Sequence, residues 1–189
     1  MDDKQALRRR IRAQLDALSP AEKAGLDAAL LANVTAFPQY QAADTLLCYV
    51  SLPFEPDTRR IIEAAWAQGR QTAFPVCTAP GEMQFCLARS WDELVSGAYG
   101  IPEPSGREVP CITERTLCIV PGYAFAADGR RLGKGGGYYD RFLAEYPALF
   151  TMGLTYAFLL QEEIPCEPHD IGVNAVITDR NLSFGGNHG

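Results

Sequence analysis

A cluster of glycines with charged neighbours is the part of this sequence best suited to chemistry. The segment from Arg131 to Asp140 reads RLGKGGGYYD. Glycine lets backbone N–H groups approach an anion closely, and a helix beginning near Tyr138 would direct its positive end at the same anion. Arg131 and Lys134 add positive charge for phosphate oxygens, and Asp140 offers the carboxylate ligand that Mg²⁺ prefers. The segment therefore predicts a site for phosphates and magnesium.

The segment matches neither of two common nucleotide-binding motifs. A Walker A loop has four residues between its first glycine and Gly-Lys, but Gly129 and Gly133 are separated by three, and Gly135 follows the lysine. In a Rossmann G-x-G-x-x-G motif the last glycine would fall at Tyr138. A flexible turn before a helix would account for the glycines alone, but it would not explain the basic residues or the acid behind them.

Charged residues elsewhere have two interpretations each. Lys4, Arg8 and Arg12 are spaced by four residues, so they form one stripe of a helix. That stripe is either a solvated face or a second contact to phosphates. Glu55, held between Phe54 and Pro56, is either an ordinary loop acid or an acceptor for a heterocycle with amino and ring N–H groups.

Two further segments also have two interpretations each. The loop GIPEPSG, residues 100–106, is either a lid or a connection. The pair His169–Asp170 is either an acid–base pair or a device that orients its turn.

Hydrophobic periodicity predicts the elements that position these residues. Leu7, Ile11, Leu15 and Leu18 recur at helical spacing, and the sequence from Ser19 to Glu22 is typical of a helix start with a capping box. That second helix is expected to run to Ala36. Further helices are predicted at residues 58–68 and 138–146, and strands at 45–50, 71–77, 83–88, 116–120, 150–156 and 173–178.

This alternation of strands and helices predicts an α/β fold with a largely parallel sheet. Ligands of such sheets bind outside the carboxyl ends of the strands. Residues 51–57 follow one predicted strand and residues 121–140 follow another, so both stretches are expected at the same edge.

Composition limits the classes of function. The chain has 189 residues, enough for one domain, and its net charge of −6 argues against broad nucleic-acid binding. It has no apolar run of about 18 residues, so no membrane span is expected. Six cysteines without a C-x-x-C pair, and only two histidines, argue against a zinc site. We expect the cysteines to be reduced core thiols and the protein to be cytoplasmic.

At this point a family resemblance can be stated. The stretch RLGKGGGYYDRFL, preceded by PGYAF, resembles the signature of 5-formyltetrahydrofolate cyclo-ligases, also called methenyltetrahydrofolate synthetases. The resemblance continues in order along nearly the whole chain. Its other parts are K-x-x-L-R at Lys4 to Arg8, YVSLPFEPDT at Tyr49 to Thr58, YGIPEP at Tyr99 to Pro104, and IPCEPHDIGVNAVIT at residues 164–178. The glycine signature is specific, whereas the terminal parts are weaker alone.

The resemblance implies an activity and an architecture. ATP and 5-formyltetrahydrofolate, with or without a polyglutamate tail, would give 5,10-methenyltetrahydrofolate, ADP and phosphate in the presence of Mg²⁺. The fold would be a three-layer α/β/α sandwich with a mostly parallel sheet, forming a single domain over residues 1–189. The protein is expected to be a monomer that uses neither nucleic acid nor membrane as a partner.

The resemblance also implies residue roles. The ATP contacts would be Lys4, Arg8, Arg131, Leu132, Gly133, Lys134, Gly135, Gly136, Gly137, Tyr138 and Tyr139. Asp140 would bind magnesium, and Glu55 would hold the pterin, with Val50 at the start of the folate-contacting stretch. Tyr139 would lie near the formyl group and the transferring phosphate, so Tyr139, Lys134 and Arg131 are the predicted catalytic residues.

One position departs from the family pattern. Asn174 stands where the family usually has an aspartate. If that acid assists magnesium, Asn174 offers a neutral carbonyl oxygen instead. Metal affinity would then be weaker, or Asp170 or Asp179 would contribute.

Two rival functions fit the same residues. Another small-molecule ATP enzyme, such as a kinase, could use the same glycine loop. A regulator that binds nucleotide or folate without turnover is the other alternative.

Overall fold

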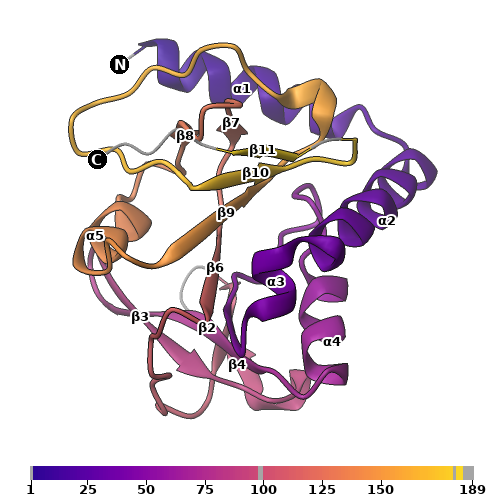
Figure 1. Cartoon of the computed structure of the whole chain (residues 1–189). Helices are drawn as coiled ribbons and strands as arrows, with labels where there is room; N and C mark the ends of the chain where they lie inside the picture. Colours follow the sequence, from indigo (N-terminus) through magenta and orange to yellow (C-terminus); the bar gives the residue numbers. More distant parts are fainter. Residues whose placement is uncertain (1, 98–99, 181, 185–189) are drawn as a thin grey trace.

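A central sheet organises the computed structural model, which describes residues 2–97, 100–180 and 182–184. Its strand order is β11-β10-β9-β6-β1-β2-β3 (Figure 1). The five inner strands, β10 to β2, are parallel, and the two edge strands, β3 and β11, are antiparallel to their neighbours. The strands are β1 (Thr45–Leu47), β2 (Gln71–Ala79), β3 (Glu82–Leu87), β6 (Thr116–Val120), β9 (Phe150–Leu154), β10 (Ala175–Ile177) and β11 (Leu182–Phe184).

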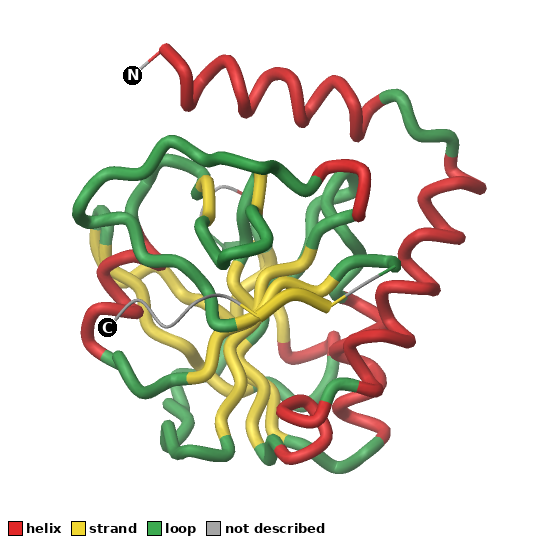
Figure 2. Tube along the Cα trace, turned by 45° about the horizontal axis from the view of Figure 1, so that its top comes forward, coloured by secondary structure: helices red, strands yellow, loops and turns green. Residues whose placement is uncertain are grey.

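Helices cover both faces of this sheet. Apolar residues of α1 (Asp2–Asp16), α2 (Pro20–Ala36), α3 (Pro38–Ala42) and α4 (Arg59–Ala67) belong to one core cluster. Residues Phe142 and Leu143 of α5 (Tyr138–Glu145) belong to a second cluster, with Leu47, Phe85 and Cys118. Figure 2 shows the strands in the middle, the helices outside them and many loops below α1. The predicted α/β/α sandwich with a mostly parallel sheet is confirmed.

The start of α2 follows its sequence signals. The Ser19 hydroxyl accepts a hydrogen bond from the Glu22 N–H at 3.2 Å, and the Glu22 carboxylate accepts one from the Ser19 N–H at 2.9 Å. This capping box satisfies backbone donors that the first turn leaves unpaired. The helix ends at Ala36, as predicted.

Short elements in the loops were not predicted from the sequence. Two small hairpins form, one from β4 (Leu94–Ser96) and β5 (Pro102–Pro104), the other from β7 (Ala124–Phe125) and β8 (Arg131–Leu132). β5 lies in a proline-rich stretch that predicts a loop, but proline is tolerated in an edge strand. β1 also ends three residues earlier than expected, although Cys48, Tyr49 and Val50 remain buried.

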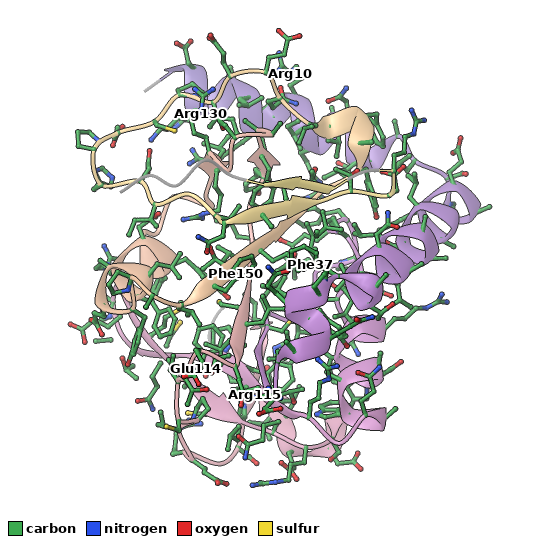
Figure 3. The ribbon with its side chains drawn as sticks, viewed as in Figure 1. Arg10, Phe37, Glu114, Arg115, Arg130 and Phe150 are labelled. Atoms are coloured by element: carbon green, nitrogen blue, oxygen red, sulfur yellow. The ribbon has the colours of Figure 1, made fainter. Side chains whose placement is uncertain are left out.

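Buried contacts tie distant segments together. The Asp27 carboxylate accepts hydrogen bonds from the Tyr156 hydroxyl at 2.6 Å and from the Asp57 N–H at 3.0 Å. Phe37, at the end of α2, packs against Phe150 of β9 with ring centroids 6.0 Å apart (Figure 3). α2 is thereby fixed both to β9 and to the loop that follows β1.

The expectation for the cysteines is only half right. Cys48, Cys86 and Cys118 are buried free thiols, as predicted. Cys77, Cys111 and Cys166 are exposed free thiols, because they lie at the end of a strand or in loops rather than in the middle of the sheet.

No helix in the described part of the chain is long and apolar enough to cross a membrane.

Gly25 provides a test of the helix propensity of α2. It is exposed within the helix, and no atom lies within 4 Å of a Cβ added there. We expect Gly25→Ala to raise the free energy of unfolding by about 0.5–1 kcal/mol, because alanine loses less backbone entropy on folding. Urea denaturation would measure the change. Ala28→Gly, at another exposed position of α2, should lower stability by a similar amount, and equal stability of all three proteins would contradict this account.

Candidate active site

A cavity of about 500 Å³ opens at the carboxyl edge of the parallel strands. It lies where β1 and β6 run side by side in parallel register, from Thr45 opposite Thr116 to Leu47 opposite Cys118. The segments that follow these strands both face it, as the sequence predicts. Its lining residues are Tyr49, Val50, Leu52, Pro75, Cys77, Met83, Ile101, Glu103, Pro121, Arg131, Gly133, Lys134, Gly135, Gly136, Gly137, Tyr138, Tyr139 and Asp140.

The glycine loop from Gly133 to Gly137 forms one wall of this cavity. Gly135 and Gly137 have φ angles of +100° and +67°, a region in which other residues are strained. Gly137 is the N-cap of α5, so the loop passes directly into the positive end of that helix. The Arg141 side chain fixes the loop by donating to the carbonyls of Gly136 at 2.6 Å and Gly81 at 2.5 Å.

Lys134 and Glu55 form an ion pair between the glycine loop and the loop after β1. The Lys134 Nζ lies 2.5 Å from the Glu55 Oε1, and the other carboxylate oxygen accepts a hydrogen bond from the Leu52 N–H at 2.8 Å. The Glu55 side chain is 6% exposed and the Lys134 side chain 37%. Two residues predicted for different ligands are therefore brought into direct contact.

Arg131 and Asp140 form a second, more buried pair. The Arg131 Nη2 lies 2.5 Å from the Asp140 Oδ1, and the arginine side chain is only 3% exposed. Arg131 also donates to the Pro121 and Ile171 carbonyls. Asp140 accepts a further hydrogen bond from the Ile171 N–H at 3.0 Å. Both side chains are held rigidly at the cavity wall.

Asp140 is suited to magnesium in the company of phosphates. It lines the cavity, and Mg²⁺ in nucleotide sites is usually bound by one or two carboxylates, phosphate oxygens and water. Within the described ranges, no group of three or more His, Cys, Asp or Glu residues could enclose a metal. A single carboxylate beside the glycine loop would fit a metal that is bound mainly by the phosphates of a nucleotide.

The other candidate metal ligands have partners elsewhere. The Asn174 Oδ1 accepts hydrogen bonds from the Thr151 N–H at 2.7 Å and its hydroxyl at 2.8 Å. Asp179 accepts from the Ala157 N–H at 2.6 Å. Asn174 thus ties the start of β10 to β9, which gives it a structural contact independent of any metal.

Tyr139 has an unsatisfied hydroxyl in the cavity wall. Its oxygen is buried and has no hydrogen-bond partner in the part of the chain that is described. Burial raises the pKa of Tyr139 well above its ordinary value, and the nearby Cys118 and Cys48 add to the rise. The hydroxyl therefore stays protonated at neutral pH and keeps a hydrogen atom that it can donate.

The basic stripe of α1 lies against the site but outside the cavity. The Arg8 Nε donates to the Gly133 carbonyl at 3.0 Å, so α1 supports the glycine loop. The Lys4 Nζ pairs with Asp170 at 2.6 Å and with Glu167 at 3.5 Å. Burial lowers the pKa of Lys4, but the hydrogen bond and charge of Asp170 and Glu167 outweigh it and raise the pKa overall.

These contacts bear on the two interpretations of His169–Asp170. Asp170 accepts from the Glu167 N–H at 2.7 Å in addition to Lys4, which is a turn-orienting arrangement. The His169 side chain is 71% exposed. Asp170, and not His169, thus anchors α1 to the loop before β10.

The remaining predicted residues are divided between cavity and core. Val50 and Tyr138 line the cavity. Leu132 is buried in the core cluster, and its carbonyl accepts a hydrogen bond from the Tyr123 N–H at 2.8 Å. Any contact of Leu132 with a nucleotide would therefore be indirect.

Sequence reasoning missed several cavity residues. Pro75 and Cys77 lie two apart on β2 and Met83 is on the paired strand β3, so one face of this hairpin forms a wall. The signal available for these positions was that residues two apart on a predicted strand face the same side of the sheet. Ile101 and the buried Glu103 show that the loop GIPEPSG also contributes a wall. Tyr99, the first residue of the YGIPEP motif, lies outside the described residues.

Comparisons with known proteins agree with one another. A model described as the 5-formyltetrahydrofolate cyclo-ligase family matches residues 1–179. The 5-formyltetrahydrofolate cyclo-ligase of Escherichia coli K12 is 32% identical over 174 residues, which cover 89% of this chain and 96% of that protein. The mouse protein of the same name is 28% identical, with 92% of each chain covered.

Two solved structures of 5,10-methenyltetrahydrofolate synthetases resemble this structure. The NMR structure of Aquifex aeolicus 5,10-methenyltetrahydrofolate synthetase superposes with a TM-score of 0.83 at 27% identity, covering 96% of this chain and 92% of that one. A 5,10-methenyltetrahydrofolate synthetase from Mycoplasma pneumoniae shares the fold, with a TM-score of 0.73 at 23% identity, covering 94% of this chain and 99% of that one.

The left-handed conformation of Gly137 can be tested directly. A Cβ at this position would be strained by its φ of +67° and would lie 2.9 Å from the Arg141 Nη1. We expect Gly137→Ala to lower the free energy of unfolding by about 1–2 kcal/mol. Its ATP dissociation constant should rise about tenfold, equivalent to 1.4 kcal/mol.

Gly106→Ala is the matched control, because a Cβ there meets no atom within 4 Å and Gly106 does not line the cavity. Denaturation and nucleotide titration would compare the two variants. Equal ATP affinity in both would show that the conformation of Gly137 does not matter for the nucleotide.

Proposed function

Because the chain belongs to the 5-formyltetrahydrofolate cyclo-ligase family, we propose that it converts 5-formyltetrahydrofolate to 5,10-methenyltetrahydrofolate with the consumption of ATP. The observation that carries the proposal is the cavity lined by the glycine loop and by Tyr49, Val50 and Leu52, with Glu55 beside it in an ion pair with the lining residue Lys134. Its volume of about 500 Å³ lies within the range of small-molecule sites. Because the glycine loop and the loop after β1 both border this cavity, we propose that the phosphate donor and the heterocycle meet there.

The chemistry requires activation of a poor leaving group. The formyl oxygen attacks the γ-phosphorus of ATP, the bond to the bridging oxygen breaks, and ADP leaves. N10 of the folate then attacks the formyl carbon, and the phosphorylated oxygen departs as phosphate. Loss of the N10 proton completes the methenyl ring. The protein mainly has to align the two ligands and balance charge.

Positive groups on the glycine-loop side are suited to the phosphates. Lys134 and the start of α5 face the cavity, and Arg8 supports the loop from outside. Arg131 acts by holding Asp140 at the wall. Asp140 would hold Mg²⁺, which supplies neutralisation of phosphate charge when bound.

The folate side offers groups of a different kind. The Glu55 carboxylate can accept hydrogen bonds from the amino and ring N–H groups of the pterin. Tyr139 can donate its unpaired hydroxyl to an oxygen on which charge develops. Val50, Met83 and Ile101 form apolar wall, which limits the access of water to a phosphorylated intermediate.

Partners follow from the same reaction. ATP and 5-formyltetrahydrofolate, with or without a polyglutamate tail, are the proposed ligands, and a monomer contains all of the residues assigned here.

Formation of the product is the decisive experiment. Purified protein with ATP, Mg²⁺ and 5-formyltetrahydrofolate should generate the near-ultraviolet absorbance of the methenyl product, and chelation of Mg²⁺ should stop it. Phosphoryl transfer to another acceptor without that absorbance would favour a kinase. Tight binding of both ligands without release of ADP would favour a regulator.

Tyr139→Phe separates a chemical role from a structural one. Removing a hydroxyl that has no hydrogen-bond partner among the described residues should leave the unfolding free energy equal or slightly higher. We expect kcat to fall about 100-fold, the loss typical of a donor to developing charge. Tyr146→Phe, at the exposed end of α5, is the control and should leave kcat unchanged. An unchanged kcat in Tyr139→Phe would remove this residue from the catalytic group.

A further inference from the structure

The Lys134–Glu55 ion pair joins the glycine loop, which lines the cavity, to the loop after β1, whose Glu55 lies beside the cavity and not in its lining. Lys134 belongs to the loop that faces the phosphates, and Glu55 to the loop that faces the heterocycle. We propose that this pair is a latch that makes the binding of nucleotide and folate mutually reinforcing. The inference rests on the proposed function, because it takes these two ligands as the occupants of the cavity.

The same atoms serve the latch and the ligands. The Lys134 Nζ that would meet a phosphate is 2.5 Å from the Glu55 Oε1. Glu55 keeps one other donor, the Leu52 N–H at 2.8 Å on Oε2. Opening the latch therefore leaves Oε1 available for the N–H groups of a heterocycle, and the ammonium group available for phosphate oxygens.

Burial decides the sign of the coupling. Glu55 is 6% exposed, so a charge left there without Lys134 loses its partner in a place that water reaches poorly. A nucleotide that binds alone draws Lys134 away and leaves that carboxylate unsatisfied. A folate that binds alone must displace Lys134 from it. The binding free energy of the first ligand is reduced by the free energy needed to separate Lys134 from Glu55. The second ligand finds the pair already open, so each ligand raises the affinity for the other.

Linkage makes the effect reciprocal. In the wild-type protein, a saturating non-hydrolysable ATP analogue with Mg²⁺ should lower the dissociation constant of 5-formyltetrahydrofolate about tenfold. Saturating 5-formyltetrahydrofolate should lower that of the analogue by the same factor. Titration calorimetry measures both constants.

Two substitutions should each tighten the binding of the ligand on the opposite side. Lys134→Met removes the competitor of Glu55, so 5-formyltetrahydrofolate without nucleotide should bind about tenfold more tightly than to the wild type. Glu55→Gln releases Lys134 and keeps an acceptor for the Leu52 N–H, so the analogue without folate should also bind more tightly. A residue that merely maintained the structure would weaken both ligands when replaced.

One control keeps the positive charge at position 134, and the other removes a positive charge nearby in the sequence. Lys134→Arg should retain the coupling, because it retains the cation. Arg130→Met removes a cation that pairs with Asp128 at 2.7 Å outside the cavity, and it should leave both dissociation constants and the coupling unchanged. Thermal unfolding of each variant would verify that it is folded.

The outcomes distinguish a failure of the latch proposal from a failure of the proposed function. If the wild type forms the methenyl product but Lys134→Met binds folate equally or more weakly, the latch is wrong and the enzyme activity stands. The latch is also wrong if the wild type turns over but neither ligand changes the dissociation constant of the other. If the wild type binds neither ligand and forms no product, the proposed function itself fails.

Discussion

Parallel pairing of β1 with β6 is the constraint on which the rest of the site depends. Because the two strands are parallel and aligned in register, the segments that follow them leave the sheet at the same edge. The loop with Glu55 and the loop with Lys134, far apart in sequence, therefore meet across one cavity. Without this pairing, each loop would hold a charged group with nothing opposite it.

The charged side chains in and around the cavity balance one another. Lys134 is neutralised by Glu55, Arg131 by Asp140 and Lys4 by Asp170. Pairing of this kind spares a half-buried site the cost of isolated charges. A ligand that took one of these groups as its partner would have to replace the internal contact with an external one. The affinity of a ligand for such a site would depend on the difference between two sets of contacts, which is the physical basis of the coupling that we propose.

Residue patterns predicted much of this molecule because they report local physics. The capping box at Ser19 and the helical spacing of Leu7, Ile11 and Leu15 describe preferences of a few neighbouring residues, and the helices formed where these indicated. The glycine segment was found because its backbone requirements are also local. The small hairpins β4–β5 and β7–β8 were missed because their pairing depends on the tertiary contacts of short, weakly patterned segments.

The sequence by itself determined the fold class, the glycine loop and the types of charged groups available, since these depend on local propensity and residue chemistry. Only the tertiary structure decided which charges meet. It placed Glu55 against Lys134, turned Arg131 toward Asp140 and engaged the Asn174 oxygen with Thr151. It also left the Tyr139 hydroxyl without a hydrogen-bond partner in the part of the chain that is described. It also brought Cys77 and Met83 to the cavity wall. Distances of a few ångströms between segments many residues apart arise from the packing of the whole sheet, and no local pattern encodes them.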